Sequence, residues 1–130
     1  MTPVGLLLYY NRTIRSVTEY ACQAWHSGLT KGQSDKLELI QRRSLYVIYP
    51  ELSYSVALNE SGLTTLEQRR TGLCRDFFNN MQQDSHKLNY ILPKKVHKSG
   101  TRSQRKYPLP KCRTERFKRS FIPYCLFNFQ

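Results

Sequence analysis

Basic and aromatic side chains alternate along residues 93–130, a composition typical of segments that bind polyanions. This segment holds eleven Lys and Arg and a single acid, Glu115, so its formal charge is +10. Residues 1–92 hold ten basic and eight acidic side chains and carry only +2. A cation that neutralises a phosphate releases condensed counterions, which gives affinity that is independent of sequence and falls with salt. The concentration of charge therefore predicts a polyanionic partner.

The candidate contact residues of this segment are its cations and two of its rings. We expect phosphate contacts from Lys94, Lys95, Arg102, Arg105, Lys106, Lys111, Arg113, Arg116, Lys118 and Arg119. Tyr107 and Phe117 are the first candidates for stacking on unpaired bases, with Phe121 and Tyr124 after them. The alternative packs Phe117, Phe121 and Ile122 on the rest of the protein and leaves the charges as a solvated surface. For the charges we favour phosphate contact, because +10 in so short a segment repels itself without anions.

Two pairs of adjacent arginines form a second candidate surface. They are Arg42, Arg43, Arg69 and Arg70. Adjacent residues of a helix point about 100° apart, so only one member of each pair can share the core-facing side. The alternative is a set of ordinary surface ion pairs, for example from Arg42 to Glu38 and from Arg70 to Glu67.

Metal and nucleophilic chemistry find little support in the spacing of the His and Cys residues. Four potential zinc ligands occur in the order His86, His97, Cys112 and Cys125. Their spacings are wider than the two tight pairs, roughly two to four residues apart, of structural zinc sites. Cys22 and His26 are one helical turn apart, a spacing more typical of a buried thiol beside a partly exposed His than of a catalytic pair. We expect no metal, no cofactor and no enzymatic activity.

The elements that position these residues are predicted to be helices. Apolar periodicity and end signals place helical stretches over residues 3–28, 35–49, 53–60 and 65–84. Thr2 and Pro3 are a helix start, Gly62 is a helix end, and Pro50 stops the second helix. The first stretch is long for one helix, with a break at residues 11–13 as the alternative.

Further details of the second and fourth helices follow from the same patterns. We expect Ser34 and Asp35 to cap the second helix, and its inward face to hold Leu37, Ile40, Ser44, Val47 and Ile48. Thr64 and Glu67 have the spacing of a capping box at the start of the fourth helix. Its inward side is predicted to hold Leu66, Leu73, Cys74, Phe77 and Met81, and its outward side Arg69, Asp76 and Gln83.

The predicted fold class is mainly α, with a small bundle of three to four helices in residues 1–92 and an irregular basic tail over residues 93–130. Neither part is long and apolar enough to span a membrane, and the apolar residues 4–10 lack the basic start and cleavage site of a signal peptide. The four cysteines include no Cys-x-x-Cys pair. We expect them to be reduced, and we expect the protein in the nucleus or cytoplasm rather than secreted.

Three sequence elements in series resemble the C-terminal end of reverse transcriptases from non-LTR (LINE-type) retrotransposons of the Jockey and chicken-repeat group. The first is Glu19-Tyr20-Ala21 with Trp25 and Leu29, then Leu37-Glu38-x-Ile40-Gln41-Arg42-Arg43. The second is Tyr54-x-x-Ala57-Leu58-x-x-x-Gly62-Leu63-x-x-Leu66-x-x-Arg69-Arg70. The third is Tyr107-x-x-Pro110-x-Cys112-Arg113-Thr114-x-Arg116-Phe117-x-x-Ser120-Phe121-Ile122-Pro123. The resemblance covers essentially the whole chain.

The resemblance implies a thumb and post-thumb region, which in such polymerases holds the template–primer duplex by its backbone. The catalytic carboxylates of the palm are not here, because the aspartates of the chain are isolated at Asp35, Asp76 and Asp84. Two-metal phosphoryl transfer needs clustered carboxylates. The resemblance therefore implies binding of RNA or an RNA–DNA duplex without catalysis, and a polymerase palm domain as a potential partner.

Other interpretations stay open. Residues 10–49 are similar to a stretch assigned to the N-terminal part of an AlkB-type dioxygenase–methyltransferase fusion, but the chain has neither a His-x-Asp iron-binding pair nor a Gly-rich nucleotide loop. A protein-interaction module that docks through its apolar C-terminal end is the alternative from another class. A degenerate sequence without a selected function is the third, and it predicts a molten chain.

Overall fold

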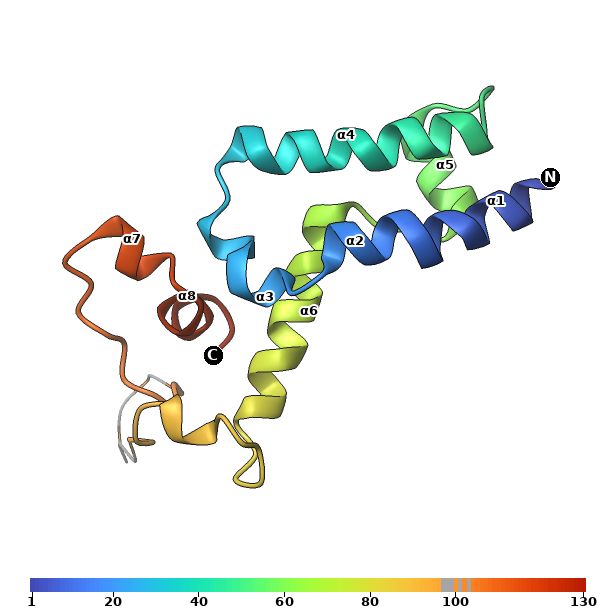
Figure 1. Ribbon diagram of the computed structural model, residues 1–130. Helices are drawn as coiled ribbons and strands as arrows, with labels where there is room; N and C mark the ends of the chain where they lie inside the picture. The colour runs from blue at the N-terminus through green and yellow to red at the C-terminus, as the bar shows by residue number, and fades with distance from the viewer. Residues whose placement is uncertain (97–99, 101, 103) are drawn as a thin grey trace. The chain divides into compact units, whose positions relative to one another are not determined.

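The computed structural model describes residues 1–96, 100, 102 and 104–130 of the protein. Among these residues the protein is mainly helical, as predicted, and no strand occurs. The chain divides into two compact units (Figure 1). Unit 1 consists of Met1–Cys22 and Leu29–Thr71, and unit 2 of Gln23–Gly28 and Gly72–Gln130. The predicted boundary after residue 92 followed the charge, whereas this division follows packing.

The first helical stretch is interrupted later than the expected site. It consists of α1 (Pro3–Tyr9), a π-helical segment (Tyr10–Ile14), α2 (Arg15–Glu19), α3 (Cys22–Trp25) and a 3-10 turn (His26–Gly28). The Thr2 hydroxyl accepts a hydrogen bond from the Gly5 amide at 3.2 Å, which confirms the predicted cap. The helix continues through residues 11–13 with π geometry and breaks at Tyr20 and Ala21, where Ala21 has a φ of 50°.

The two following helices of unit 1 are α4 (Lys31–Ile48) and α5 (Tyr54–Ser61). Thr30 caps α4 in a capping box with Gln33, so the predicted cap at Ser34 and Asp35 is wrong. Gly62 ends α5 with a φ of 67°, a left-handed conformation that glycine adopts without a Cβ clash, as expected.

The inward face of α4 differs from the predicted one. Gln41, Leu45 and Ile48 are buried, whereas Ile40 and Val47 are 41% and 68% exposed. The burial of Ile48 agrees with the prediction. Both sides of this helix carry apolar residues at helical spacing, so periodicity alone wrongly included Ile40 and Val47 in the inward face. The buried core of unit 1 consists of Tyr10, Leu45, Ile48 and Ala57.

A buried polar network centred on Gln41 joins the helices of unit 1. The Gln41 carbonyl oxygen accepts a hydrogen bond from the Tyr10 hydroxyl at 2.7 Å. Its amide nitrogen donates to the Thr64 carbonyl at 2.9 Å and to the Tyr54 hydroxyl at 3.1 Å. The Tyr54 hydroxyl donates to Glu38, whose other oxygen accepts from the Leu66 amide at 2.9 Å. The network thus satisfies polar groups from every helix that surrounds it.

Helix α6 (Leu66–Met81) begins in unit 1 and continues in unit 2. Thr65 and Gln68 bond reciprocally at its start, one residue later than the predicted capping box. Cys74, Phe78 and Met81 are buried along it. The predicted outward residues, namely Arg69, Asp76 and Gln83, are exposed.

The irregular character predicted for residues 93–130 is not confirmed. A 3-10 turn (Asn89–Ile91) precedes this segment, which then forms α7 (Glu115–Lys118) and α8 (Phe121–Asn128). Thr114 caps α7 by accepting from the Phe117 amide at 3.2 Å. Pro123 does not interrupt α8, because it lies in the first turn, where its missing N–H needs no partner.

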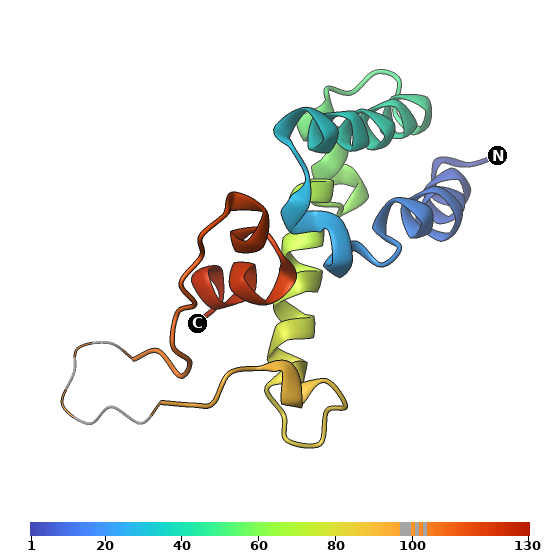
Figure 2. The ribbon, with the colours of Figure 1, turned by 60° about the vertical axis from the view of Figure 1, so that its left-hand side comes forward.

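Helix α8 packs on the unit 2 portion of α6 (Figures 1 and 2). Phe78, Tyr107, Cys125 and Leu126 form the buried core of unit 2. Around it, rings meet edge to face, as in the contact of Phe77 with Phe121 at 5.7 Å between centroids. None of the helices in the described part of the chain is long and apolar enough to cross a bilayer.

The Gln41 network leads us to expect that removal of its central amide lowers the stability of the protein. Gln41→Leu leaves the Tyr10 hydroxyl and the Thr64 carbonyl without their partner, so we expect the free energy of unfolding to fall by about 2 kcal/mol. Urea denaturation followed by circular dichroism measures this change. Gln83→Leu, at an exposed position, is the matched control, and equal stability of the two variants would contradict the role of the network.

The raised pKa of Tyr54 leads us to expect a loss of stability at alkaline pH. Burial, together with the hydrogen bond to Glu38, raises the pKa of Tyr54 from 10.0 to about 12. The unfolded chain therefore loses this proton at a lower pH than the folded protein. The contribution of Tyr54 to stability is thus fully present below about pH 10 and is lost from there towards pH 12. The decline, measured by urea denaturation at each pH, should be smaller in Tyr54→Phe but unchanged in the exposed control Tyr46→Phe.

Candidate nucleic-acid interface

Within unit 2, hydrogen bonds between Tyr107 and Gln130 hold the middle of the basic segment against the end of α8. The Gln130 side chain accepts from the Tyr107 amide at 2.9 Å and donates to the Tyr107 carbonyl at 3.1 Å and the Leu126 carbonyl at 2.9 Å. The Tyr107 ring, 3% exposed, packs against Phe78 at 6.4 Å between centroids. Burial raises the pKa of Tyr107, and its hydroxyl has no hydrogen-bond partner among the described residues.

Tyr107 is therefore a core residue, and the prediction that it stacks on bases is corrected because its ring has no accessible face. Phe117, by contrast, is 47% exposed and stays a candidate for stacking. Phe121, Ile122 and Tyr124 pack around the core of unit 2. Tyr124 also meets the His26 ring edge to face at 5.9 Å.

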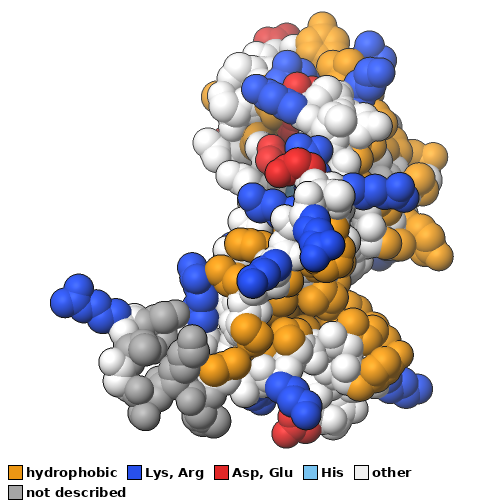
Figure 3. All heavy atoms as spheres, turned by 90° about the vertical axis from the view of Figure 1, so that its left-hand side faces the viewer, with side chains coloured by type: hydrophobic (Ala, Val, Ile, Leu, Met, Phe, Trp, Pro, Cys, Tyr) orange, Lys and Arg blue, Asp and Glu red, His pale blue; other side chains and the backbone are white. Residues whose placement is uncertain are grey.

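The predicted phosphate contacts of residues 93–130 all lie at the surface where they are described. Ten cations are exposed, namely Lys94, Lys95, Arg102, Arg105, Lys106, Lys111, Arg113, Arg116, Lys118 and Arg119. None of them forms an ion pair within the described part of the chain. Figure 3 shows Lys and Arg side chains at many places on the face that includes α7, with fewer Asp and Glu. These cations are thus available to an anionic ligand.

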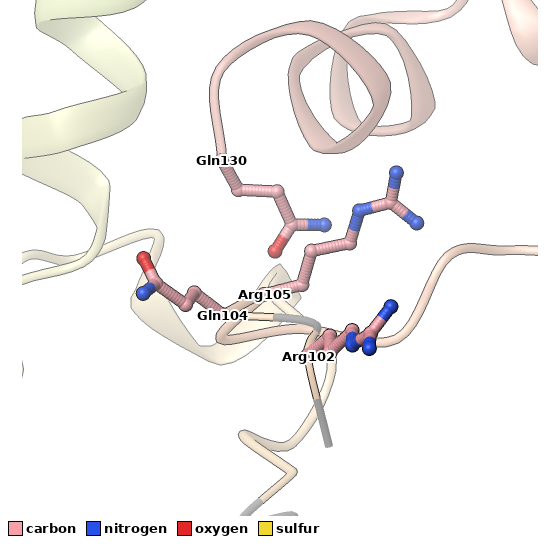
Figure 4. Close-up of a pocket in the computed structure, with 4 residues that line it drawn as sticks. All are labelled: Arg102, Gln104, Arg105 and Gln130. Carbon is pink, nitrogen blue, oxygen red and sulfur yellow. The ribbon is translucent and has the colours of Figure 1, made fainter.

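One hollow in this surface is lined by Arg102, Gln104, Arg105 and Gln130 (Figure 4). In this view the guanidinium groups of Arg102 and Arg105 extend to the same side, and Gln104 extends to the other. Because Gln130 also holds Tyr107, the chain beside Arg105 is fixed to α8. Two guanidinium groups beside one hollow suit the planar, bidentate recognition of phosphate.

A second hollow lies beside α7. It is lined by Ala24, Ser27, Gly28, Glu115, Arg116, Arg119 and Ser120. The only acid of the basic segment, Glu115, thus shares a hollow with two of its arginines. Sequence reasoning selected the arginines but missed Glu115, Ser27 and Ser120. The spacing of four residues between Glu115 and Arg119 places both on one side of a helical turn and was the available signal.

The four arginines of unit 1 have different surroundings. Arg43 is exposed, and the Arg42 guanidinium lies 4.9 Å from the centre of the Tyr54 ring rather than in the predicted alternative pair with Glu38. The Arg69 Nε lies 3.2 Å from a Glu19 oxygen.

Arg70 is removed from the candidate interface. It is completely buried, and its guanidinium donates to the Ser34 hydroxyl at 2.8 Å, so it is beyond the reach of a phosphate. Sequence reasoning allowed one member of each arginine pair on the core-facing side of its helix but counted both as candidate contacts.

The described residues contain no group of three or more potential metal ligands. Of the four candidates for zinc, His97 lies outside the described residues. Cys125 belongs to the apolar core of unit 2, where burial raises the pKa of its thiol to about 12. Its thiolate, the form that binds metals, is therefore disfavoured at neutral pH.

Comparisons with protein-family models, with curated proteins and with solved structures found no match to this chain.

The contrast between Tyr107 and Phe117 gives a prediction. We expect Tyr107→Ala to lower the free energy of unfolding by about 3 kcal/mol because it opens a cavity in the core of unit 2. Phe117→Ala should lower it by less, about 1 kcal/mol at most, because this residue is 47% exposed. Urea denaturation of both variants checks this order, and equal losses would show that Phe117 is also part of the core.

Proposed function

We propose that this protein binds RNA or an RNA–DNA duplex through the phosphate backbone, like the thumb and C-terminal region of the LINE-type reverse transcriptases that its sequence resembles. The observation that carries the proposal is the set of ten exposed cations between Lys94 and Arg119, none of which has an ion-pair partner in the described part of the chain. Exposed cations without an internal ion pair remain free to contact phosphates, and phosphate contacts supply affinity without sequence preference.

The packing of the basic segment supports this proposal. Tyr107, Phe121 and Leu126 pack the segment on α6. Folding therefore already restricts the conformations of the segment, and binding loses less conformational entropy. Arg42 and Arg43 on α4 are exposed and form a second candidate contact of the same kind. Phe117 is exposed between Arg116 and Lys118, which supports it as a candidate for stacking on an unpaired base.

Charge neutralisation in and around α7 tests the proposal without removing the core residues that follow it. In R113Q/R116Q/R119Q we expect binding of a single-stranded RNA to weaken, and the slope of log K against log[salt] to become shallower by about 2. Fluorescence anisotropy over a salt series measures both. The control R12Q/K31Q/K36Q removes the same charge from exposed positions of unit 1. If both variants lose affinity equally, binding follows net charge and the proposed interface is wrong.

A second candidate function is docking on a protein such as a polymerase palm domain. The outward face of α4 favours it, because Leu39, Ile40, Tyr46 and Val47 are 40% to 68% exposed at spacings of one helical face. Light scattering and gel shifts compare the two functions. Association that is insensitive to salt, without a shift of RNA, would favour docking over nucleic-acid binding.

A further inference from the structure

We infer that the hollow beside α7 is a ribose-phosphate subsite, in which Arg116 and Arg119 hold a phosphate and Glu115 accepts a hydrogen bond from a neighbouring 2′-hydroxyl. The inference rests on the proposed function and deepens it, because it names the residue that distinguishes RNA from DNA. It concerns the residues that line this hollow, which all belong to unit 2.

The geometry of α7 brings the three charged side chains to one place. Arg116 and Arg119 are three residues apart, and Glu115 and Arg119 are four apart, so each pair lies on one side of a single helical turn. Ser27 and Ser120 line the same hollow and bring hydroxyl groups to it. The hollow thus combines donors for an anion with an acceptor for a hydroxyl proton.

The carboxylate is the unexpected member of this group. A surface that binds only phosphates gains nothing from an acid, which repels the anion. Glu115 forms no ion pair with a described residue, although two arginines line the hollow with it. Glu115 lies in the first turn of α7, where a helix dipole stabilises a carboxylate. Because α7 has only four residues, few aligned peptides contribute to that dipole, and it accounts for little of the role of Glu115.

A ribonucleotide offers both groups that this hollow can bind. Its phosphate matches the two guanidinium groups, and the adjacent 2′-hydroxyl donates to a carboxylate, as ribose hydroxyls do at nucleotide sites. DNA offers the same phosphate without that donor, and the carboxylate then only repels it. A site of this kind tells RNA from DNA at the sugar rather than at the base.

The experiment compares one RNA with the DNA of the same sequence, both single-stranded, by fluorescence anisotropy at fixed salt. We expect the wild-type protein to prefer RNA by about tenfold, the effect of one hydrogen bond to a charged group. In Glu115→Ala the ratio of RNA affinity to DNA affinity should fall close to one, because the affinity for DNA rises and the affinity for RNA falls. Glu115→Gln keeps an acceptor oxygen and should retain part of the preference.

Two controls separate this effect from charge and from folding. Glu51→Ala makes the same change of charge at an exposed position of unit 1 and should leave the RNA-to-DNA ratio unchanged. RNA with 2′-O-methyl groups removes the donor without changing the protein. The wild-type protein should bind the methylated RNA with the affinity that it has for DNA. Glu115→Ala should bind methylated and unmethylated RNA with equal affinity.

Each outcome has a separate meaning for the two proposals. If the wild type binds RNA and DNA equally, with affinity that falls steeply with salt, the subsite is wrong and the proposed function stands. Full retention of the RNA preference in Glu115→Ala would also overturn the subsite. If neither nucleic acid binds, the proposed function fails, and the subsite fails with it.

Discussion

The packing of α8 on α6 is the interaction on which the rest of unit 2 depends. Phe78 is completely buried there, in the same cluster as Tyr107, Cys125 and Leu126. The hydrogen bonds of Gln130 to the Tyr107 backbone join this cluster to the chain that carries the cations. Without these contacts a segment of charge +10 would expand by self-repulsion. The apolar cluster therefore keeps the charges close together on an ordered surface.

This arrangement assigns separate roles to residues that are neighbours in sequence. Between residues 107 and 126, Tyr107, Phe121 and Leu126 belong to or pack on the core, while the Lys and Arg residues are exposed. The short helix α7 exposes Phe117 among cations and places Glu115 in a hollow with Arg116 and Arg119. A concentrated positive surface with one exposed ring and one acid suits a ligand that offers phosphates, bases and hydroxyl groups.

Local signals predicted the ends of several elements, whereas long-range packing decided which side chains are inside. Thr2 and Gly62 act as predicted, because a cap and a left-handed residue depend on their own few neighbours. The inward face of α4 was predicted only in part, with Ile48 buried but Ile40 and Val47 exposed, because both sides of the helix are apolar and only its packing partners select one. Tyr107 and Arg70 were assigned to the surface from their residue types, yet both are buried, because their partners come from distant parts of the sequence. The ten cations of the basic segment that the structure describes are exposed, as solvation of charge requires.

The central claim is that this surface binds nucleic acid through phosphates. The measurement that tests it most directly is the affinity of the 130-residue chain for a single-stranded RNA between about 50 and 200 mM salt. The account predicts a linear fall of log K with log[salt], with a slope that corresponds to several phosphate contacts and is the same for unrelated RNA sequences. Affinity that does not change with salt, or no binding at the lowest salt, would contradict it.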